Sequence, residues 1–370
     1  MTARLVYVEV GSLLTKNLTG IGRLVARMIE ALARRVSVRL VTTIGEDQAR
    51  SLGLSTRLLC GQEIRISQGT LPSADGDVGE WTRQLLYHSR RRHDPRAAGD
   101  HAGIYPVLRP AERHFRREIC YLHDFTPLLL PWAHLPGTCE HFGIFFTNTS
   151  RMCDFAVANS RSTKNDARWL LALPEGRVFV GQPGPTLCVD RHAFPHPVER
   201  LDNAILIVST LEPRKNGKLL LDWFLHTTAL PKSMELWWVG PTGWLGDAAQ
   251  HRPRNRGERR IRFLGMVSDG ALCRLYRQAT FTVYPSLYEG FGFPVLDSLC
   301  HQSPVLCAYN SSLQEFEGPG VFYFDACDPS SLDAAYRQLC CNQDDPIPQR
   351  ELRSRFSWDH LADTMLKLCA

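Results

Sequence analysis

Several features that mark other classes of protein are missing from this chain of 370 residues. No apolar run approaches the length that a transmembrane helix needs. None of the twelve cysteines belongs to a CxxC pair, and their irregular spacing favours neither a zinc site nor a disulfide framework. We therefore expect reduced thiols, mostly in the core, and a cytoplasmic protein. No metal site and no nucleic-acid recognition motif is evident, so we expect no metal, no other cofactor and no nucleic-acid partner.

The composition is that of a packed globular protein, with 44% hydrophobic and 22% charged residues. A chain of this length suits two domains better than one. Its first fourteen residues have the pattern of a strand and not of a signal peptide.

The net charge of +5 is concentrated in two stretches. Residues 83–118 carry nine arginines against four acids, and residues 251–262 carry six arginines against one acid. Apolar residues such as Trp81 and Leu85 flank and interrupt the first stretch. It suits either a peripheral contact with anionic lipid at the inner face of the cytoplasmic membrane or a solvated loop.

Strand-like and helix-like segments alternate along the chain, which predicts parallel α/β sheets. In the first half we expect a helix over 21–35, because Leu24, Met28, Ala31 and Leu32 share one face. The strands expected around this helix and after it span residues 5–10, 38–42, 119–123 and 155–158.

A second cycle begins after the Pro/Gly-rich residues 181–187, with strands expected at 204–208, 236–239, 262–264, 282–284 and 305–308. The simplest architecture is α/β, with two Rossmann-like doubly wound domains facing a central cleft. We place the domains at 1–190 and 191–355, followed by a closing helix over 356–370. Ligands of such sheets bind at the carboxyl ends of the strands.

The segment from Tyr284 to Leu306 combines two carboxylates with a helix start. Glu289 enters a glycine-rich turn, a helix begins near Pro294, and Asp297 lies one turn inside that helix. A helix start offers free N–H groups to an anion, and carboxylates accept hydrogen bonds from hydroxyl groups. This pattern is typical of a site for a sugar joined to a diphosphate.

A second segment, Val208 to Asn216, follows the first strand of the second cycle and carries Arg214 and Lys215 before a helix. Cations at that place can neutralise a diphosphate leaving group. The alternative is a surface charge pair, although a cation near a helix start is slightly unfavourable.

Together these segments resemble the retaining GT-B glycosyltransferases of family 4, nearest their bacterial mannosyl- and rhamnosyltransferases. The resemblance covers nearly the whole chain. It includes TGIGR at 19–23, the HD pair at 123–124, PRKN at 213–216, FLG at 263–265, the run from Glu289 to Asp297, and FSWDHLA at 356–362. In the family the closing helix crosses back to the N-terminal domain.

The resemblance implies specific roles in donor binding. Lys215 binds the diphosphate with Arg214 nearby, and Glu289 holds hydroxyl groups of the donor sugar. The amides of Phe291, Gly292 and Phe293 line the sugar and phosphate site, and Asp297 holds the ribose hydroxyl groups.

The N-terminal half supplies the remaining residues that the resemblance implies. Gly20 and Gly22 let their loop approach the donor phosphates and the acceptor closely. Arg23 contacts an acceptor phosphate, and His123 lies near the reacting sugar carbon. Asp124 either contacts the acceptor or ties down the loop that follows it.

Two positions depart from the family pattern, and a third has two possible roles. Asp297 stands where the family has Glu, and Thr210 stands where many members have Arg, so Lys215 and the helix start carry more of the phosphate charge. Asp269 is expected to cap a helix that begins near Ala271, or else to bind the donor by reading a guanine base.

We therefore expect a metal-independent hexosyltransferase with His123, Lys215 and Glu289 as its catalytic residues. GDP-mannose is the favoured donor, ahead of dTDP-rhamnose and UDP-hexoses, and the acceptor is a surface polysaccharide or lipid-linked glycan. Front-face substitution explains retention, because no carboxylate is an obvious nucleophile. A sugar-nucleotide epimerase and a non-catalytic binding protein of the same fold remain as alternatives of other classes.

Overall fold

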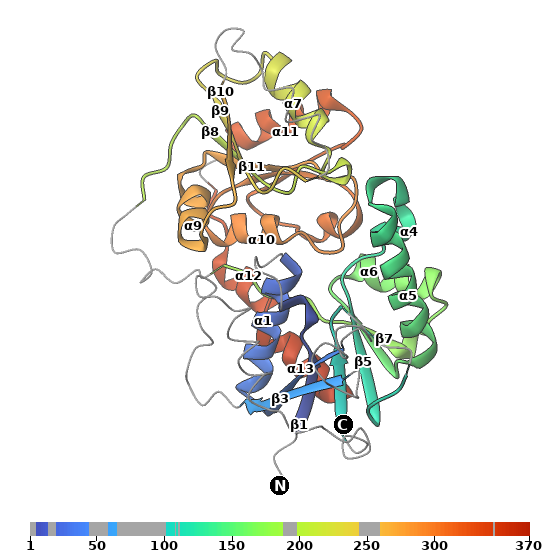
Figure 1. The fold of residues 1–370 in the computed structure, drawn as a ribbon. Helices are drawn as coiled ribbons and strands as arrows, with labels where there is room; N and C mark the ends of the chain where they lie inside the picture. Colours follow the sequence, from blue (N-terminus) through green and yellow to red (C-terminus); the bar gives the residue numbers. More distant parts are fainter. Residues whose placement is uncertain are drawn as a thin grey trace. The chain divides into compact units, whose positions relative to one another are not determined.

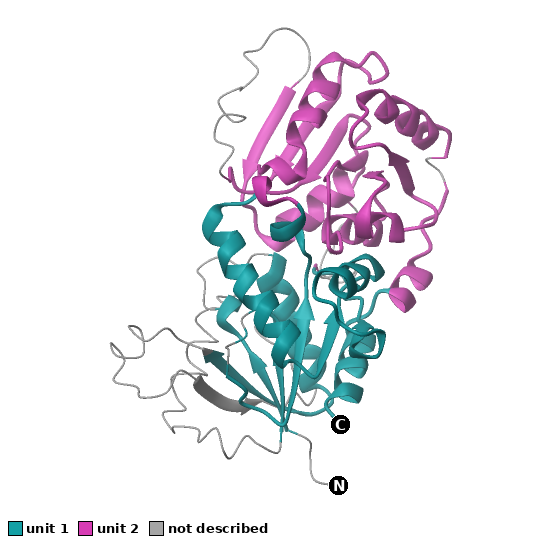
Figure 2. Ribbon diagram, turned by 90° about the vertical axis from the view of Figure 1, so that its right-hand side faces the viewer, with its two compact units in different colours: residues 1–129, 134–186, 356–370 teal, residues 130–133, 187–355 magenta. Residues whose placement is uncertain are grey.

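The computed structural model describes residues 5–13, 20–43, 58–64, 101–107, 109, 112–187, 198–243, 260–342 and 345–370. The chain divides into two compact units (Figure 2). Unit 1 comprises residues 1–129, 134–186 and 356–370, and unit 2 comprises residues 130–133 and 187–355. Each unit contains one sheet with helices packed against it (Figure 1).

The sheet of unit 1 has seven strands in the order β3-β2-β1-β4-β5-β6-β7. All neighbours are parallel except β2 and β3 at one edge, which pair antiparallel. The strands are β1 (Leu5–Glu9), β2 (Ser37–Thr43), β3 (Leu58–Ile64), β4 (Ala102–Tyr105), β5 (Arg117–Leu122), β6 (Phe155–Ala158) and β7 (Val178–Val180). An antiparallel edge strand on a parallel sheet is common in doubly wound folds.

The helices of unit 1 cover this sheet. They are α1 (Gly20–Ala33), α4 (Thr126–Leu129), α5 (Pro136–Met152), α6 (Arg161–Leu170) and α13 (Trp358–Leu368), with 3₁₀ turns η1 (Gly11–Leu13) and η3 (Glu175–Arg177). A further turn, η2 (Pro131–Ala133), belongs to unit 2. The predicted helical face of α1 is confirmed, because Leu24, Met28, Ala31 and Leu32 are all buried.

The closing helix α13 packs on α1 within unit 1 (Figure 1). Arg35, two residues after the end of α1, forms ion pairs with Asp359 at 2.9 Å and with Asp363 at 2.7 Å. The Trp358 indole N–H donates to the Pro185 carbonyl oxygen at 2.8 Å. Leu361 is buried, and a Cβ on Gly181 would lie only 2.7 Å from its Cδ1. Apolar burial and close approach therefore hold the end of the chain to this unit.

The sheet of unit 2 has six parallel strands in the order β10-β9-β8-β11-β12-β13. They are β8 (Ala204–Val208), β9 (Glu235–Val239), β10 (Arg260–Gly265), β11 (Phe281–Tyr284), β12 (Val305–Ala308) and β13 (Val321–Phe324). The two doubly wound sheets confirm the predicted α/β fold class. The strand order of unit 2 reverses between β8 and β11, and ligands of such folds bind at the carboxyl ends of strands at this switch point.

The helices of unit 2 are α7 (Gly217–His226), α9 (Asp269–Gln278), α10 (Phe293–Cys300), α11 (Pro329–Cys341) and α12 (Gln349–Arg355), with 3₁₀ turns η5 (Pro213–Lys215) and η6 (Ser311–Glu315). Both predicted site segments leave the sheet at the switch point. The segment that contains η5 follows β8, and the segment that leads to α10 follows β11.

Most of the basic stretch at 83–118 lies outside the described residues. Two of its arginines are described in ion pairs inside unit 1. Arg109 and Glu118 form a fully buried pair, and Arg113 lies 2.5 Å from Asp154. Arg109 is enclosed by protein and takes no part in any membrane-facing surface, while the membrane contact of the stretch as a whole stays a prediction.

Candidate active site in unit 2

The turn after β8 has a defined shape that places two cations at the switch point. Asn216 adopts a left-handed conformation with φ of 53°, and its side-chain amide donates to the Ala326 carbonyl oxygen at 2.8 Å. Helix α7 begins at Gly217, where an added Cβ would lie 2.6 Å from the Trp238 ring. The predicted position of Arg214 and Lys215 in a turn before this helix is confirmed.

Arg214 and Lys215 both contact the carboxylate of Glu289. The Lys215 ammonium lies 2.5 Å from Glu289 Oε1, and the Arg214 guanidinium lies 2.8 Å from Glu289 Oε2. The side chains of these three residues are only 9 to 12% exposed. The structure thus brings together three of the predicted donor-site residues, although Glu289 follows Lys215 by 74 positions.

Two further side chains complete this charged cluster. The Tyr284 hydroxyl accepts from Lys215 at 3.0 Å and donates to Glu289 Oε1 at 3.1 Å. Glu212, with a 9% exposed side chain, accepts from Arg214 at 2.8 Å. Two cations and two carboxylates therefore balance one another in a nearly enclosed space.

Burial and neighbouring charge set the protonation of the cluster. Burial alone would raise the pKa of Glu289, but the charges of Arg214 and Lys215 outweigh it and lower that pKa to about 2. Burial lowers the pKa of Lys215, and the charge of Arg214 lowers it further. Burial raises the pKa of Tyr284, with the Glu289 charge adding to the effect. Glu289 is therefore a carboxylate at neutral pH.

Backbone contacts fix Glu289 between two segments of unit 2. Its N–H donates to Ser311 Oγ at 2.9 Å, and its carbonyl oxygen accepts from Ser312 Oγ at 2.8 Å. The neighbouring Leu287 N–H donates to the Arg214 carbonyl oxygen at 2.9 Å. These bonds join the turn after β11 to the turn after β8 and to η6, which follows β12, and they hold the carboxylate against the cations.

Helix α10 starts one residue before the predicted Pro294, and its start depends on a glycine. Gly292 has φ of 107°, and a Cβ there would lie 2.7 Å from Leu313 Cδ2. The Phe291 and Phe293 rings meet edge to face at 5.0 Å. Asp297 is 4% exposed, with its Oδ1 3.5 Å from the Leu187 N–H. The glycine therefore sets the direction in which the first amides of the helix point.

The predicted residues His123 and Asp124 lie at the carboxyl end of β5 in unit 1. The His123 Nε2 lies 2.8 Å from the Pro106 carbonyl oxygen, which only accepts, so Nε2 carries the proton in this contact. Burial lowers the pKa of His123. Asp124 Oδ1 accepts from both the N–H and the hydroxyl of Thr126, at 2.8 and 2.7 Å. The loop-tying interpretation of Asp124 therefore has direct contacts behind it.

The three other predicted residues of unit 1 lie in the first turn of α1. The helix begins at Gly20, so Gly20, Gly22 and Arg23 are helical, and the residues just before them lie outside the described part of the chain. A Cβ on Gly20 would meet nothing within 4 Å. A need for glycine at this position would have to come from a ligand, which stays a prediction.

The expected capping role of Asp269 is wrong. The N-cap of α9 is Ser268, whose Oγ accepts from the Ala271 N–H at 3.3 Å. Asp269 is instead the first residue of the helix, where its charge favours the positive end of the helix dipole. The sequence offered Ser and Asp side by side, both good caps, and the backbone of Ser268 took the extended conformation that capping needs.

Sequence reasoning missed Glu212, Tyr284, Ser311 and Ser312 as members of the site. The two serines are far from Glu289 in sequence, and no local pattern connects them to it. Tyr284 ends a buried strand and has the appearance of core. Glu212 lies two residues before Arg214, and that spacing was an available signal for an ion pair.

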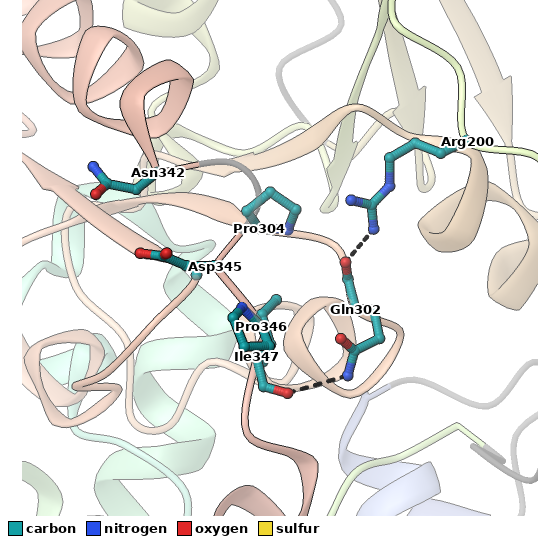
Figure 3. A pocket seen from close by; sticks show the side chains of 8 residues that line it. Arg200, Gln302, Pro304, Asn342, Asp345, Pro346 and Ile347 are labelled. Atoms are coloured by element: carbon teal, nitrogen blue, oxygen red, sulfur yellow. Dashed lines mark hydrogen bonds between the residues drawn. The ribbon is translucent and has the colours of Figure 1, made fainter.

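A separate cavity of about 190 Å³ lies at the amino ends of β12 and β13, away from the charged cluster (Figure 3). Arg200 donates to the Gln302 carbonyl oxygen there, and the Gln302 side chain donates to the Ile347 carbonyl oxygen at 3.3 Å. Pro304 and Gly320, which precede the two strands, also line it. This cavity is not part of the predicted donor site.

The described residues contain no group of three or more His, Cys, Asp or Glu side chains arranged to hold a metal ion. Within those same ranges, no helix combines the length and the apolar character needed to cross a membrane. The ten cysteines with described side chains are all free thiols.

Known proteins are similar to this chain in fold or in sequence. Sucrose-phosphate synthase from Thermosynechococcus elongatus superposes with a TM-score of 0.66 over 99% of this chain and 98% of its own, at 14% identity. Serotype-specific mannosyltransferase WbdA from Escherichia coli is 25% identical over 271 residues, or 67% of this chain and 33% of WbdA. O-antigen chain mannosyltransferase B from the same organism is 34% identical over 168 residues, 42% of each chain. The chain thus spans about a third of the length of WbdA.

Two doubly wound sheets, the first parallel except at one edge, together with this structural similarity define an α/β protein of the GT-B fold. Residues 202–342, which contain the whole cluster, match the model of the family Glycosyl transferases group 1. This part of the chain is therefore similar to the group 1 glycosyltransferases.

Proposed function

We propose that the protein transfers a hexose, with mannose favoured, from a nucleoside diphosphate sugar to a growing surface polysaccharide or lipid-linked glycan. The observation that carries this proposal is the cluster of Arg214, Lys215 and Glu289 at the switch point of a domain similar to the group 1 glycosyltransferases. The names of the relatives, mannosyltransferases of O-antigen chains, support mannose and a surface glycan.

In this proposal unit 2 binds the donor. Arg214 and Lys215 take the diphosphate and stabilise the negative charge that develops on it as the bond to the sugar breaks. Glu289 accepts hydrogen bonds from sugar hydroxyl groups, and the first amides of α10 and Asp297 contribute to the nucleotide site. Asp269 binds the donor by reading its guanine base.

Retention follows front-face substitution in this proposal. The two cations hold both oxygens of Glu289 in this structure. When the donor is bound, hydroxyl groups of its sugar take these oxygens, so Glu289 is assigned to sugar binding and not to nucleophilic attack. The acceptor oxygen then attacks on the face that the diphosphate leaves, and the diphosphate accepts its proton. Two fixed cations supply the charge stabilisation that a metal ion would otherwise provide, so we expect no metal requirement.

Unit 1 is assigned to the acceptor. The resemblance gives Gly20, Gly22 and Arg23 to the approach of donor and acceptor phosphates, and places His123 near the reacting carbon. Asp124 has a structural partner in Thr126, so its contribution to the acceptor is expected to be indirect.

The test is a transfer assay with labelled GDP-mannose, dTDP-rhamnose and UDP-hexoses, using extracted surface glycans as acceptors. We expect transfer from GDP-mannose and a loss of about 10²- to 10³-fold in kcat for Lys215→Ala. Lys218→Ala is the matched control, because Lys218 is exposed on α7 three residues further along. Absence of transfer and hydrolysis with every donor at high enzyme concentration would reject the proposal, and release of an isomerised nucleotide sugar would indicate an epimerase.

A further inference from the structure

Both cations of the candidate site already have carboxylate partners within the protein. Lys215 contacts Glu289, and Arg214 is shared between Glu289 and Glu212. The Glu289 carboxylate thereby takes the two contacts that a diphosphate would need. A diphosphate that binds these cations therefore competes with Glu289 for them.

When a diphosphate without a sugar takes both cations, the buried carboxylate of Glu289 is left without its counter-ions. The Glu289 side chain is only 9% exposed, so few water molecules can reach it in place of the lost cations. Removing the partner of a buried charge is strongly unfavourable. After the exchange, the donors that remain on Glu289 include the Tyr284 hydroxyl at 3.1 Å and the Ser286 hydroxyl, and both are neutral. Neutral hydroxyl groups stabilise a buried carboxylate less than two cations do.

A nucleotide sugar does not leave Glu289 in this condition, because it brings hydroxyl groups that donate hydrogen bonds to a carboxylate. The cations pass to the phosphate oxygens, and the sugar hydroxyl groups take their place on Glu289. A nucleoside diphosphate can take the cations, but it has no sugar hydroxyl groups at this position to donate to Glu289.

We propose that Glu289 is a specificity residue that favours the nucleotide sugar over the nucleoside diphosphate left after transfer, by competing for Arg214 and Lys215. This inference rests on the proposed function, since it assumes that the two cations receive a diphosphate. The exchange breaks no covalent bond. Its consequence is weak product inhibition, because the departing diphosphate is displaced as Glu289 recovers its cations.

The experiment is equilibrium calorimetry on the full chain with three kinds of ligand. Pyrophosphate carries the charge alone, GDP, UDP and dTDP add a base, and their hexose derivatives add the sugar. In Glu289→Gln we expect pyrophosphate and the nucleoside diphosphates to bind about tenfold more tightly than in the wild type, since a neutral amide no longer competes. The preference for the nucleotide sugar should disappear at the same time.

Two control variants test whether the effect of Glu289→Gln comes from competition for the cations, from a general loss of negative charge, or from a change in side-chain contacts. Glu212→Gln removes an equally buried charge from Arg214 and should tighten all three ligands alike, keeping the preference for the sugar. Glu289→Asp keeps the charge, so its affinity for pyrophosphate should stay within a few-fold of the wild type. Far-ultraviolet circular dichroism verifies that each variant is folded.

The inference is overturned if folded Glu289→Gln binds pyrophosphate no more tightly than the wild type does. That outcome would mean that Glu289 is only a sugar contact. It is also overturned if Glu212→Gln abolishes the preference as fully as Glu289→Gln does. A failure of the proposed function is read separately, in the transfer assay of the wild type, and the pyrophosphate measurement does not depend on it.

Discussion

Gly292→Ala is the substitution whose effect can be worked out most directly from the structure. The residue has φ of 107°, where side chains other than that of glycine are strained by about 1–3 kcal/mol. The new Cβ would also lie 2.7 Å from Leu313 Cδ2 and 3.2 Å from the Phe316 ring. Both neighbours are buried, and crowding of this kind typically adds about 1 kcal/mol or more. We expect the free energy of unfolding to fall by about 2–4 kcal/mol.

Urea denaturation followed by circular dichroism measures this change. With a slope of about 2 kcal/mol/M, the midpoint should fall by about 1–2 M. Gly270→Ala is the matched control in the same unit, because it lies in α9 and a Cβ there would meet nothing within 4 Å. Its midpoint should stay or rise slightly, since alanine reduces the entropy of the unfolded chain. Equal midpoints for Gly292→Ala and the wild type would refute the argument that the start of α10 requires glycine.

Three further outcomes are expected. The pKa of Glu289 is about 2 in the folded protein against an ordinary 4.5, so its ionisation stabilises the folded state fully above about pH 5, and this stabilisation is lost as the pH falls toward 2. In acid titrations of the free energy of unfolding, about 3 kcal/mol of this pH dependence should be missing from Glu289→Gln. Identical curves for the variant and the wild type would contradict this expectation. In the same urea assay, Leu361→Ala should destabilise the protein by about 2–5 kcal/mol, and Asp363→Asn by less than about 1 kcal/mol, because only the Leu361 side chain is buried. A larger effect of Asp363→Asn would show that the ion pairs hold α13. Arg109→Met should lower the free energy of unfolding by about 3–5 kcal/mol, because it leaves Glu118 buried without its cation. The double variant with Glu118→Gln should lose clearly less than the sum of the losses of the two single variants. Simple additivity in this double-mutant cycle would argue against a coupled pair.

The strands whose bounds were predicted at every residue have continuous apolar runs. The spans at 155–158, 204–208 and 305–308 agree with β6, β8 and β12 at every residue. Buried parallel strands carry apolar side chains on both faces, so their pattern is local and strong. The order of the helices between them follows from the same alternation.

Other strands escaped because their signal is weak or ambiguous. Strand β4 has four residues and includes Gly103, where an added Cβ would overlap the Phe115 ring. Its glycine is explained by a partner that is distant in sequence, which no local pattern reveals. Strand β13 has two half-buried residues among its four and follows a turn rich in glycine and proline. Short edge strands of this kind depend on their neighbours more than on their own composition.

The kinds of residue at the candidate site could be inferred from the chain, because helix starts, glycine turns and charged side chains act over a few neighbouring positions. Arg214, Lys215, Glu289 and the start of α10 all belong to this local chemistry. The pairing of Lys215 with Glu289, the proton that Glu289 gives up, and the serines that hold its backbone do not. These depend on two turns meeting at the end of one sheet and on burial that excludes water, which lowers the pKa of the carboxylate. Distances and burial arise only when distant segments pack together, so the competition between Glu289 and a phosphate became visible only in the folded molecule.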